Sequence, residues 1–469
     1  MKMIQVLGTS SDSGKSTLAT AFCRILKDLG YRVSPFKAVN MSLNSIAIKD
    51  GSEIARAQWV QAMAAGAEPS AYMNPVLLKP EGHHKSQVII LGRSIGSMGI
   101  NDYYNYINKN AKIIKESIDF LSNKYDVIIS EGAGSPAEIN LAGRDFANIY
   151  VSSLYNTPAI LVADIDRGGV FASIYGTINL MQRSDLLKYY IINKMRGDQS
   201  LLYPGIERIE ELTGKKCLGI VPYIDLKLPG EDSLDYNFSG SGSIGIVRYP
   251  YMENYSDFDP LIFNEKAFYI KNKEDLKRCD VIILPGSKDV FHDLEYINSN
   301  GIADSIKRCS GEKMIIGICG GYQMLGKRIN DASGVESDGV SIPGLGLLDI
   351  ETYYNKTKTT GSVKYRFAEN QLKINGSGTG YEIHYGSIVK NNEMPLLITD
   401  HGPEGSVSSN GMVIGTNVHG ILENNEFYRY ITGEYLDYDN IIENSIETLA
   451  GIVKKSINIE GFLELLNDA

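Results

Sequence analysis

The sequence contains no apolar run approaching the roughly 20 residues that a membrane-spanning helix needs. It also lacks the pattern of a secretory signal, because one early lysine is followed at once by the strand-like segment IQVLGT. These two absences argue against a membrane-embedded or exported protein. We therefore expect a cytoplasmic protein with no membrane partner.

Cysteine is scarce, with five residues in a chain of 469, and no two of them have CxxC spacing. An odd number without paired spacing argues against a disulfide framework and against a cysteine-ligated zinc site. The five thiols suit a reducing compartment. Any chemically special cysteine must be recognised by its sequence neighbours.

Positive charge is also in short supply. The chain has 46 Lys and Arg residues against 56 Asp and Glu residues, a formal net charge of −10, which disfavours a general surface for nucleic acid. Hydrophobic residues make up 43% and charged residues 22%, as in ordinary folded domains, so extensive disorder is excluded. The length allows two or three domains, and the oligomeric state is not readable.

Short runs rich in Ile and Val alternate with amphipathic stretches, which predicts an α/β fold with mainly parallel sheets. The small polar run NFSGSGS has a linker composition and marks the domain boundary. We expect a first domain at residues 1–236, a linker at 237–243, a second domain at 244–435 and a helical tail at 436–469. Predicted buried strands include Met3–Leu7, Asp126–Ser130, Ala159–Ala163, Tyr190–Asn193, Ile244–Tyr249, Val281–Leu284 and Met314–Ile318.

A glycine-containing loop, GTSSDSGKST at residues 8–17, directly follows the first predicted strand and precedes an amphipathic helix. This order is that of a P-loop, in which backbone N–H groups and the helix N-terminus surround phosphate and a lysine adds charge. The alternative is an ordinary strand-to-helix turn. The sequence therefore predicts a nucleotide site, and its residues are Gly8, Thr9, Gly14, Lys15, Ser16 and Thr17.

Further polar residues follow predicted strands of the same domain. Glu131 ends a buried strand, so it can help Ser16 bind Mg²⁺ at the sheet edge, although a solvated loop glutamate is the alternative. Asp50 is a further candidate metal ligand, and the pattern alone does not decide between it and Glu53. Asn193 ends another strand, where it can contact the nucleotide base or simply belong to a turn.

In the second half, GICGGYQML places Cys319 between a strand and a helix, which is the thiol form of a nucleophile elbow. Among the six histidines, His419 follows a strand-like segment and precedes a glycine, so we predict that it is the base for Cys319. Backbone N–H groups at Gly286 and Gly320 are candidates to bind an oxyanion.

Taken together, these motifs resemble the cobyric acid synthase family, from about Gly8 to about Leu422. The first loop resembles the P-loop of dethiobiotin synthetase-like proteins, which also carry one extra residue. The second half resembles class I glutamine amidotransferases. The most specific matching segments are Pro35–Ser45, Met73–Pro80, Glu131–Asn140, Ala163–Phe171, Gly380–His384 and Gly415–Gly420.

This resemblance implies a ligase that uses ATP, Mg²⁺ and glutamine to amidate the b, d, e and g carboxylates of adenosylcobyrinic acid a,c-diamide, a corrinoid, through an acyl phosphate. It also implies that Asp145 handles the activated intermediate, whereas its position alone equally suits a helix N-cap. Most class I glutaminases have a glutamate two residues after the histidine, where this chain has Ile421. Whether Glu382 or a backbone group orients His419 is open.

Two other readings compete with this one. A related ligase, such as cobyrinic acid a,c-diamide synthase, has the same two domains, but Pro35–Ser45 and Met73–Pro80 favour the cobyric acid synthase family. A nucleotide-gated scaffold with an inactive glutaminase domain is the other. The presence of Lys15, Cys319 and His419 argues against it.

Overall fold

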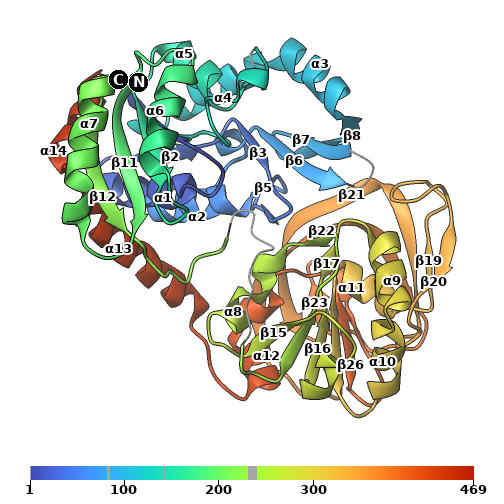
Figure 1. Ribbon diagram of the computed structural model, residues 1–469. Coiled ribbons are helices and arrows are strands. Elements are labelled where there is room, and N and C mark those ends of the chain that lie inside the picture. The colour runs from blue at the N-terminus through green and yellow to red at the C-terminus, as the bar shows by residue number, and fades with distance from the viewer. Residues whose placement is uncertain (1, 82–84, 142, 231–239, 469) are drawn as a thin grey trace.

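The computed structural model describes residues 2–81, 85–141, 143–230 and 240–468. Two α/β domains lie side by side, each built on a six-stranded sheet (Figure 1). The first sheet uses strands between residues 2 and 222, and the second uses strands between residues 244 and 416. Residues 237–239 of the predicted linker lie outside the described residues. Among the described helices, none has the length and apolar character to cross a membrane.

The first sheet has the strand order β12-β11-β10-β1-β9-β2, and all its pairings are parallel. Its strands are short apolar runs with almost continuous burial, as expected for a sheet covered on both faces. Their bounds are β1 Lys2–Gly8, β2 Val33–Phe36, β9 Val127–Glu131, β10 Ala159–Asp164, β11 Leu187–Met195 and β12 Lys216–Pro222.

Alternation of side chains along β1 explains the two helical layers. Ile4 and Val6 belong to the core that contains Phe22, whereas Met3 and Leu7 belong to two cores on the opposite face. The helices of this domain are α1 Lys15–Asp28, α2 Arg56–Ala65, α3 Ile100–Asn110, α4 Lys112–Ser122, α5 Ile149–Tyr155, α6 Val170–Leu180 and α7 Tyr203–Thr213.

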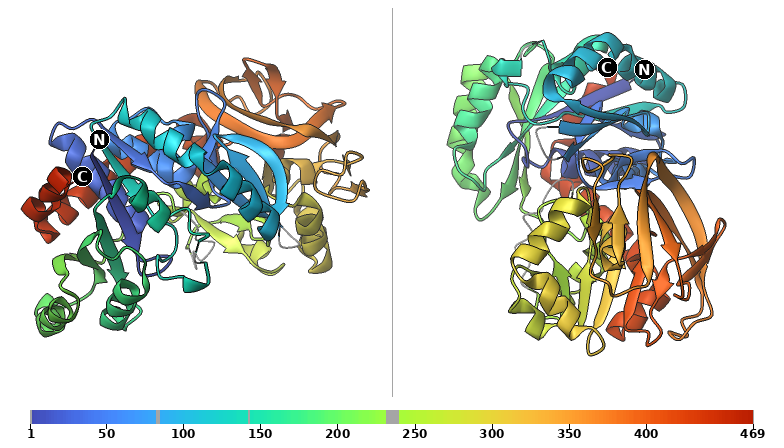
Figure 2. Two further views of the ribbon diagram at one scale, coloured as in Figure 1. Left: turned by 90° about the horizontal axis from the view of Figure 1, so that it is seen from above. Right: turned by 90° about the vertical axis from the view of Figure 1, so that its right-hand side faces the viewer.

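A smaller sheet, β3-β6-β7-β8, extends from the first domain toward the second, as the views in Figures 1 and 2 show. Beside it lies the hairpin β4–β5, whose Ile46 and Ile54 share a core with Tyr381 and Ile383 of the second domain. The two domains therefore meet through buried side chains. These strands are β3 Val39–Met41, β4 Ser45–Ala47, β5 Glu53–Ala55, β6 Val76–Glu81, β7 Lys85–Ile90 and β8 Arg93–Gly99.

The second domain has the strand order β15-β13-β16-β18-β26-β25, parallel except for the last pair. Its strands are β13 Ile244–Val247, β15 Ala267–Ile270, β16 Val281–Leu284, β18 Met314–Ile318, β25 Ser406–Val407 and β26 Val413–Thr416, and its helices are α8 Asp259–Ile262, α9 Val290–Ser299, α10 Ile302–Cys309, α11 Gly320–Leu325 and α12 Asn425–Thr432.

Two further sheets complete this domain. The two-stranded pair β14 Met252–Glu253 and β17 Gly286–Ser287 lies beside the second site. The other sheet is dominated by a long antiparallel hairpin, β21–β22. Its strands are β19 Arg328–Asn330, β20 Ser341–Pro343, β21 Ile350–Phe367, β22 Ser377–Lys390, β23 Leu397–Thr399 and β24 Gly402–Glu404.

The C-terminal helices α13 Tyr438–Ser456 and α14 Ile459–Asp468 leave the second domain and pack against the first. Phe462 stacks on Phe22 of α1 with ring centroids 4.6 Å apart, and Arg24 of α1 forms ion pairs with Glu443 and Glu447. The two termini lie close together in Figures 1 and 2. The tail thus ties the second domain to the first.

Replacing Phe462 by alanine is expected to lower the free energy of unfolding of the first domain by about 3–5 kcal/mol, because the fully buried ring leaves a cavity against Phe22. Denaturant unfolding followed by circular dichroism measures this loss. Glu464→Ala, on the exposed face of the same helix, is the matched control. A loss below about 1 kcal/mol would contradict a stabilising role for the tail.

Candidate active sites

The P-loop connects β1 to α1 in the conformation that the sequence predicts. Gly14 has φ 96° and lies immediately before Lys15, the first residue of α1. A Cβ atom at Gly8 would lie 2.4 Å from Ser13 Oγ, so this position requires glycine. Thr9 donates its backbone N–H to Val162 O of β10 at 2.9 Å, which fixes the loop to the sheet edge. Lys15 Nζ lies 2.8 Å from Ser10 O, curled over the loop.

Glu131 is fully buried at the end of β9, directly beside this loop. Ser16 Oγ donates to its Oε1 at 2.7 Å, and Lys37 Nζ lies 2.9 Å from the same oxygen. Gln61 Nε2 donates to Oε2 at 2.6 Å. The structure therefore brings Ser16 and Glu131 together as oxygen donors, which Mg²⁺ prefers.

Lys37 and Gln61 are residues that motif reasoning missed at this site. Lys37 lies within the family-specific segment Pro35–Ser45, so the resemblance contained a signal for it. Gln61 lies within α2 and carries no comparable signal in the sequence.

Two other candidates of the first domain, Asp50 and Glu53, lie away from the P-loop. Asp50 is exposed in the turn between β4 and β5, where its side chain accepts a hydrogen bond from Ser52 N at 2.9 Å, so it is not a partner of Ser16. Glu53 is buried between Lys79 and Lys358 in the domain interface. The structure brings neither carboxylate to the P-loop cluster, because the β4–β5 hairpin packs on the second domain.

Asn193 lies directly against the P-loop, and its contact with the nucleotide base stays a prediction. Its Nδ2 donates to Ser13 O at 3.0 Å, and the side chain occupies the space where a Cβ atom of Gly14 would be. Asn193 therefore supports the P-loop at Ser13 and Gly14. The lack of a side chain at Gly14 is what allows this close contact.

A cavity of about 1480 Å³ opens beside the P-loop and is lined by Lys15, Ser16 and Thr17. Asp145 also borders this cavity. Its carboxylate accepts backbone hydrogen bonds from Ala147 and Asn148 at 3.1 and 2.9 Å, just before α5. Burial raises the pKa of Asp145, although these hydrogen bonds oppose the change. Asp145 therefore borders the cavity and also holds the backbone that leads into α5, whose N-cap position is occupied by Asn148.

The second site is centred on Cys319, between β18 and α11. Cys319 has φ 50° and ψ −111°, a strained conformation for a residue with a side chain and typical of a nucleophile elbow. Its backbone N–H donates to Thr416 O at 2.8 Å, and its Sγ lies 3.6 Å from Ile383 O of β22. The thiol is buried, beside a small cavity of about 20 Å³ with room for about one water molecule.

His419 follows β26 and is completely buried. Its Nδ1 lies 2.6 Å from Oδ2 of Asp257, whose Oδ1 accepts a hydrogen bond from Gly420 N at 3.1 Å. Burial alone would lower the pKa of His419, but the Asp257 carboxylate raises it well above its ordinary value, with a contribution from Cys319. This is the arrangement of a nucleophile, a base and an orienting acid.

The orienting acid was missed in the sequence, which left Glu382 and a backbone group as candidates. Glu382 instead lies 3.9 Å from His384 Nε2. Asp257 is 162 positions away from His419 along the chain, and no motif links the two residues.

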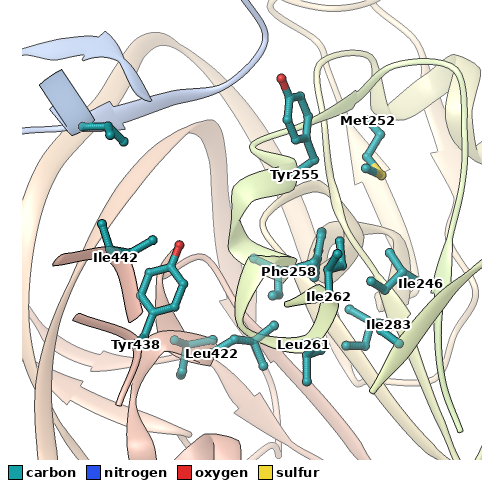
Figure 3. Close-up of a cluster of buried hydrophobic side chains, with 14 of the residues drawn as sticks. Ile246, Met252, Tyr255, Phe258, Leu261, Ile262, Ile283, Leu422, Tyr438 and Ile442 are labelled. Carbon is teal, nitrogen blue, oxygen red and sulfur yellow. The ribbon is translucent and has the colours of Figure 1, made fainter. Parts of the chain in front are cut away.

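A packed hydrophobic cluster holds Asp257 in place. Asp257 belongs to the short helical turn Tyr255–Phe258, which is followed directly by α8. Figure 3 shows Phe258, Leu261 and Ile262 of this segment packed among side chains of the second sheet and of the C-terminal tail, including Ile246, Ile283, Tyr438 and Ile442. This support fixes the carboxylate against His419.

The two predicted oxyanion positions lie beside this triad. A Cβ atom at Gly286 would lie 3.5 Å from His419 Cε1, and one at Gly320 would lie 2.8 Å from Ser287 N. The strand β17, Gly286–Ser287, is paired with β14, Met252–Glu253. The structure thus brings both glycines to the reaction centre, and at Gly320 a Cβ atom would collide with the backbone of Ser287.

Asp257→Asn is expected to reduce glutamine hydrolysis by roughly 10²- to 10⁴-fold, because the amide does not stabilise a protonated His419. The pKa of His419 should fall in this variant, since burial then acts without the opposing carboxylate. Glutamate release measures the loss of glutamine hydrolysis. The rate of Cys319 alkylation by iodoacetamide at neutral pH reports the effect of the lower His419 pKa on the thiol. Glu382→Gln is the control and should retain near-normal hydrolysis. Equal rates in the Asp257→Asn variant and the unsubstituted enzyme would contradict this assignment.

Comparisons with known proteins agree with these two sites. Residues 4–233 match the model of the CobQ/CobB/MinD/ParA nucleotide binding domain, and residues 243–427 match that of the CobB/CobQ-like glutamine amidotransferase domain. The chain is 54% identical to a probable cobyric acid synthase of Thermoplasma acidophilum, with 98% of this chain and 99% of that protein covered.

Other relatives are similar over nearly their whole length. A probable cobyric acid synthase of Methanothermobacter thermautotrophicus is 44% identical, with 99% of both chains covered. A cobyric acid synthase of a Thermoanaerobacter species is 41% identical, with 99% of this chain and 98% of that protein covered.

Proposed function

The chain belongs to the cobyric acid synthase family of glutamine-dependent amide ligases in cobalamin biosynthesis, and we propose that it amidates the b, d, e and g side-chain carboxylates of adenosylcobyrinic acid a,c-diamide to give adenosylcobyric acid. The observation that carries this proposal is that one chain combines a P-loop cavity with a buried Cys319–His419–Asp257 triad. The first site suits carboxylate activation by ATP, and the second suits release of ammonia from glutamine.

Activation precedes nitrogen transfer because a free carboxylate has no adequate leaving group. A carboxylate oxygen of the corrinoid attacks the γ-phosphorus of ATP, ADP leaves, and an acyl phosphate forms. Ammonia then attacks the acyl carbon and phosphate leaves. The P-loop backbone and Lys15 bind the phosphates and stabilise the charge that shifts to the leaving oxygen.

The cluster at Glu131 suits a divalent cation. Ser16 Oγ and Glu131 Oε1, 2.7 Å apart, provide the hydroxyl and carboxylate oxygens that Mg²⁺ binds in P-loop proteins. When bound, Mg²⁺ neutralises phosphate charge during the transfer. Lys37 and Gln61 hold the Glu131 carboxylate in place.

Glutamine hydrolysis takes place at the triad. Cys319 Sγ attacks the side-chain amide carbon while His419 accepts the thiol proton and then donates it to the departing ammonia. Water hydrolyses the resulting thioester and releases glutamate. Backbone N–H groups at Gly286 and Gly320 are the proposed donors to the oxyanion. Asp257 keeps the imidazole oriented throughout.

The large cavity also has the character that a carboxylate-rich corrinoid requires. Its lining includes apolar side chains for a bulky macrocycle and cations for side-chain carboxylates. The apolar members include Met41, Ile100 and Tyr104, and the cations include Lys85, Arg144, Arg167 and Lys194.

The identity of the nucleotide product tests whether an acyl phosphate is the intermediate. The purified chain, supplied with the corrinoid, ATP, Mg²⁺ and either glutamine or ammonium, should form one ADP and one phosphate for each amide. Chromatography of the nucleotides measures this ratio. Formation of AMP and pyrophosphate would contradict an acyl phosphate, because it would indicate an acyl adenylate.

Asp145→Asn is expected to slow amidation with glutamine and with ammonia by a similar factor of roughly 10 to 100, if the carboxylate acts on the activated intermediate. The substitution keeps the shape and much of the capping ability but removes the charge. Rates with both nitrogen sources, together with the melting temperature, separate the two roles. Reduced stability with normal turnover would leave Asp145 with only its structural role of holding the backbone before α5, and would overturn its catalytic role.

A further inference from the structure

The two cavities are separated by the hairpin β6–β7, whose side chains alternate between them. Leu78, Pro80 and Ser86 border the large cavity. Lys79 and Gln87, which are directly opposite each other in the hairpin, face the second domain. Lys79 Nζ lies 3.2 Å from Glu253 Oε2, and Gln87 Nε2 donates to Tyr385 Oη at 2.6 Å. Because a strand is one residue thick, this wall is thin.

At the end of β6, one ion pair connects the linings of the two cavities. Glu81 borders the large cavity, and Lys288 borders the small cavity that contains Cys319. Lys288 Nζ lies 2.9 Å from Glu81 Oε1, and only 7% of the lysine side chain is exposed. At this point the two cavities are therefore connected by only two side chains, Glu81 from the large cavity and Lys288 from the small one.

Lys288 is also connected to the proposed oxyanion strand. It directly follows β17, and its backbone N–H donates to Tyr251 O at 2.8 Å. Burial alone would lower the pKa of Lys288, but Glu81, Glu336 and Glu253 raise it above its ordinary value, so the side chain remains an ammonium donor. Lys288 thus links Glu81 of the large cavity to the strand that carries Gly286.

We propose that ammonia passes from the Cys319 pocket to the P-loop cavity at the Glu81–Lys288 pair, which acts as the gate between them. This inference rests on the proposed amidation. Neutral ammonia can accept a hydrogen bond from Lys288 and donate to the carboxylates of Glu81 and Glu253, so it can replace part of the ion pair as it passes. Lys79 and Gln87 of the same hairpin are buried, which limits the contact of ammonia with water, where most of it would become unreactive ammonium.

Isotope competition tests this gate. The full-length enzyme is supplied with ATP, Mg²⁺, the corrinoid, glutamine labelled with ¹⁵N in the side-chain amide, and an equal concentration of unlabelled ammonium. The unsubstituted enzyme should form product with almost only ¹⁵N. Glu81→Gln and Lys288→Met should each lower the ¹⁵N fraction at least twofold and release several glutamates for each amide formed. Lys266→Met, which removes an ion pair with Glu434 on the second domain, is the control.

The reversed pair, Glu81→Lys with Lys288→Glu, should restore part of the ¹⁵N fraction, whereas a merely structural defect would not respond in this way. The rate of amidation with ammonium alone is measured for each variant, because it shows whether the variant is folded and still activates the carboxylate. Unchanged label fractions in both single variants, or a mixed label in the unsubstituted enzyme, would overturn the gate. Absence of amide from either nitrogen source in the unsubstituted enzyme would instead overturn the proposed function.

Discussion

Replacing Cys319 by alanine should abolish glutamine-dependent amidation while leaving amidation with high external ammonia largely intact. In the proposed mechanism the Cys319 sulfur attacks glutamine, and this residue lies in the strained turn between β18 and α11. Loss of a nucleophile removes the covalent route, so the expected decrease is on the order of 10³-fold or more. Ammonia bypasses this step because it reacts at the other site.

Amide formation and glutamate release, measured in parallel, check this expectation. Cys309→Ala is the matched control, since this half-buried thiol lies at the end of α10, away from the triad. The control should retain both activities. Surviving glutamine-dependent turnover in the Cys319→Ala variant would contradict the assignment.

Replacing Lys15 by alanine should instead eliminate amidation from both nitrogen sources. Carboxylate activation precedes nitrogen entry, so a defect at the P-loop blocks glutamine and ammonia equally. Removing a cation that stabilises the transferred phosphoryl group costs on the order of 10²- to 10³-fold in rate. Lys15 lies within the P-loop, with its Nζ 2.8 Å from Ser10 O.

Steady-state ADP formation and ATP binding by calorimetry measure this effect. Lys27→Ala, near the other end of the same helix, is the control and should leave both near normal. Retained ammonia-dependent synthesis in the Lys15→Ala variant at saturating ATP would reject the role of this lysine.

Local sequence patterns were sufficient to predict the two-domain α/β architecture and the central strands of both main sheets, whereas β2, β12, β15 and β25 were not predicted. The predicted strands Val281–Leu284 and Met314–Ile318 coincide with β16 and β18, because short runs of Ile and Val with full burial leave little ambiguity. The long hairpin β21–β22 was not predicted as a whole, since its alternating, partly exposed residues give a weak signal. The packing of the tail on α1 also depends on contacts distant in sequence.

The sites likewise contain residues that local motifs indicate and residues that only tertiary contacts bring in. Motifs with fixed spacing located Lys15, Ser16 and Cys319, because their chemistry depends on one turn and the helix after it. Asp257 carries no such motif and reaches His419 only through tertiary packing. Asp50 illustrates the opposite case, in which a polar residue near a strand end satisfies the backbone of its own turn and lies away from the P-loop.

Mass spectrometry of the corrinoid product tests the central claim most directly. Adenosylcobyrinic acid a,c-diamide incubated with the enzyme, ATP, Mg²⁺ and glutamine should pass through successive species, each differing by the fixed mass change of one amidation, and should end with all four of the b, d, e and g carboxylates converted. Omission of ATP should leave the substrate unchanged. No mass change of the a,c-diamide would contradict the account. So would amidation of only the a and c carboxylates when a second substrate, in which these two are free acids, is supplied.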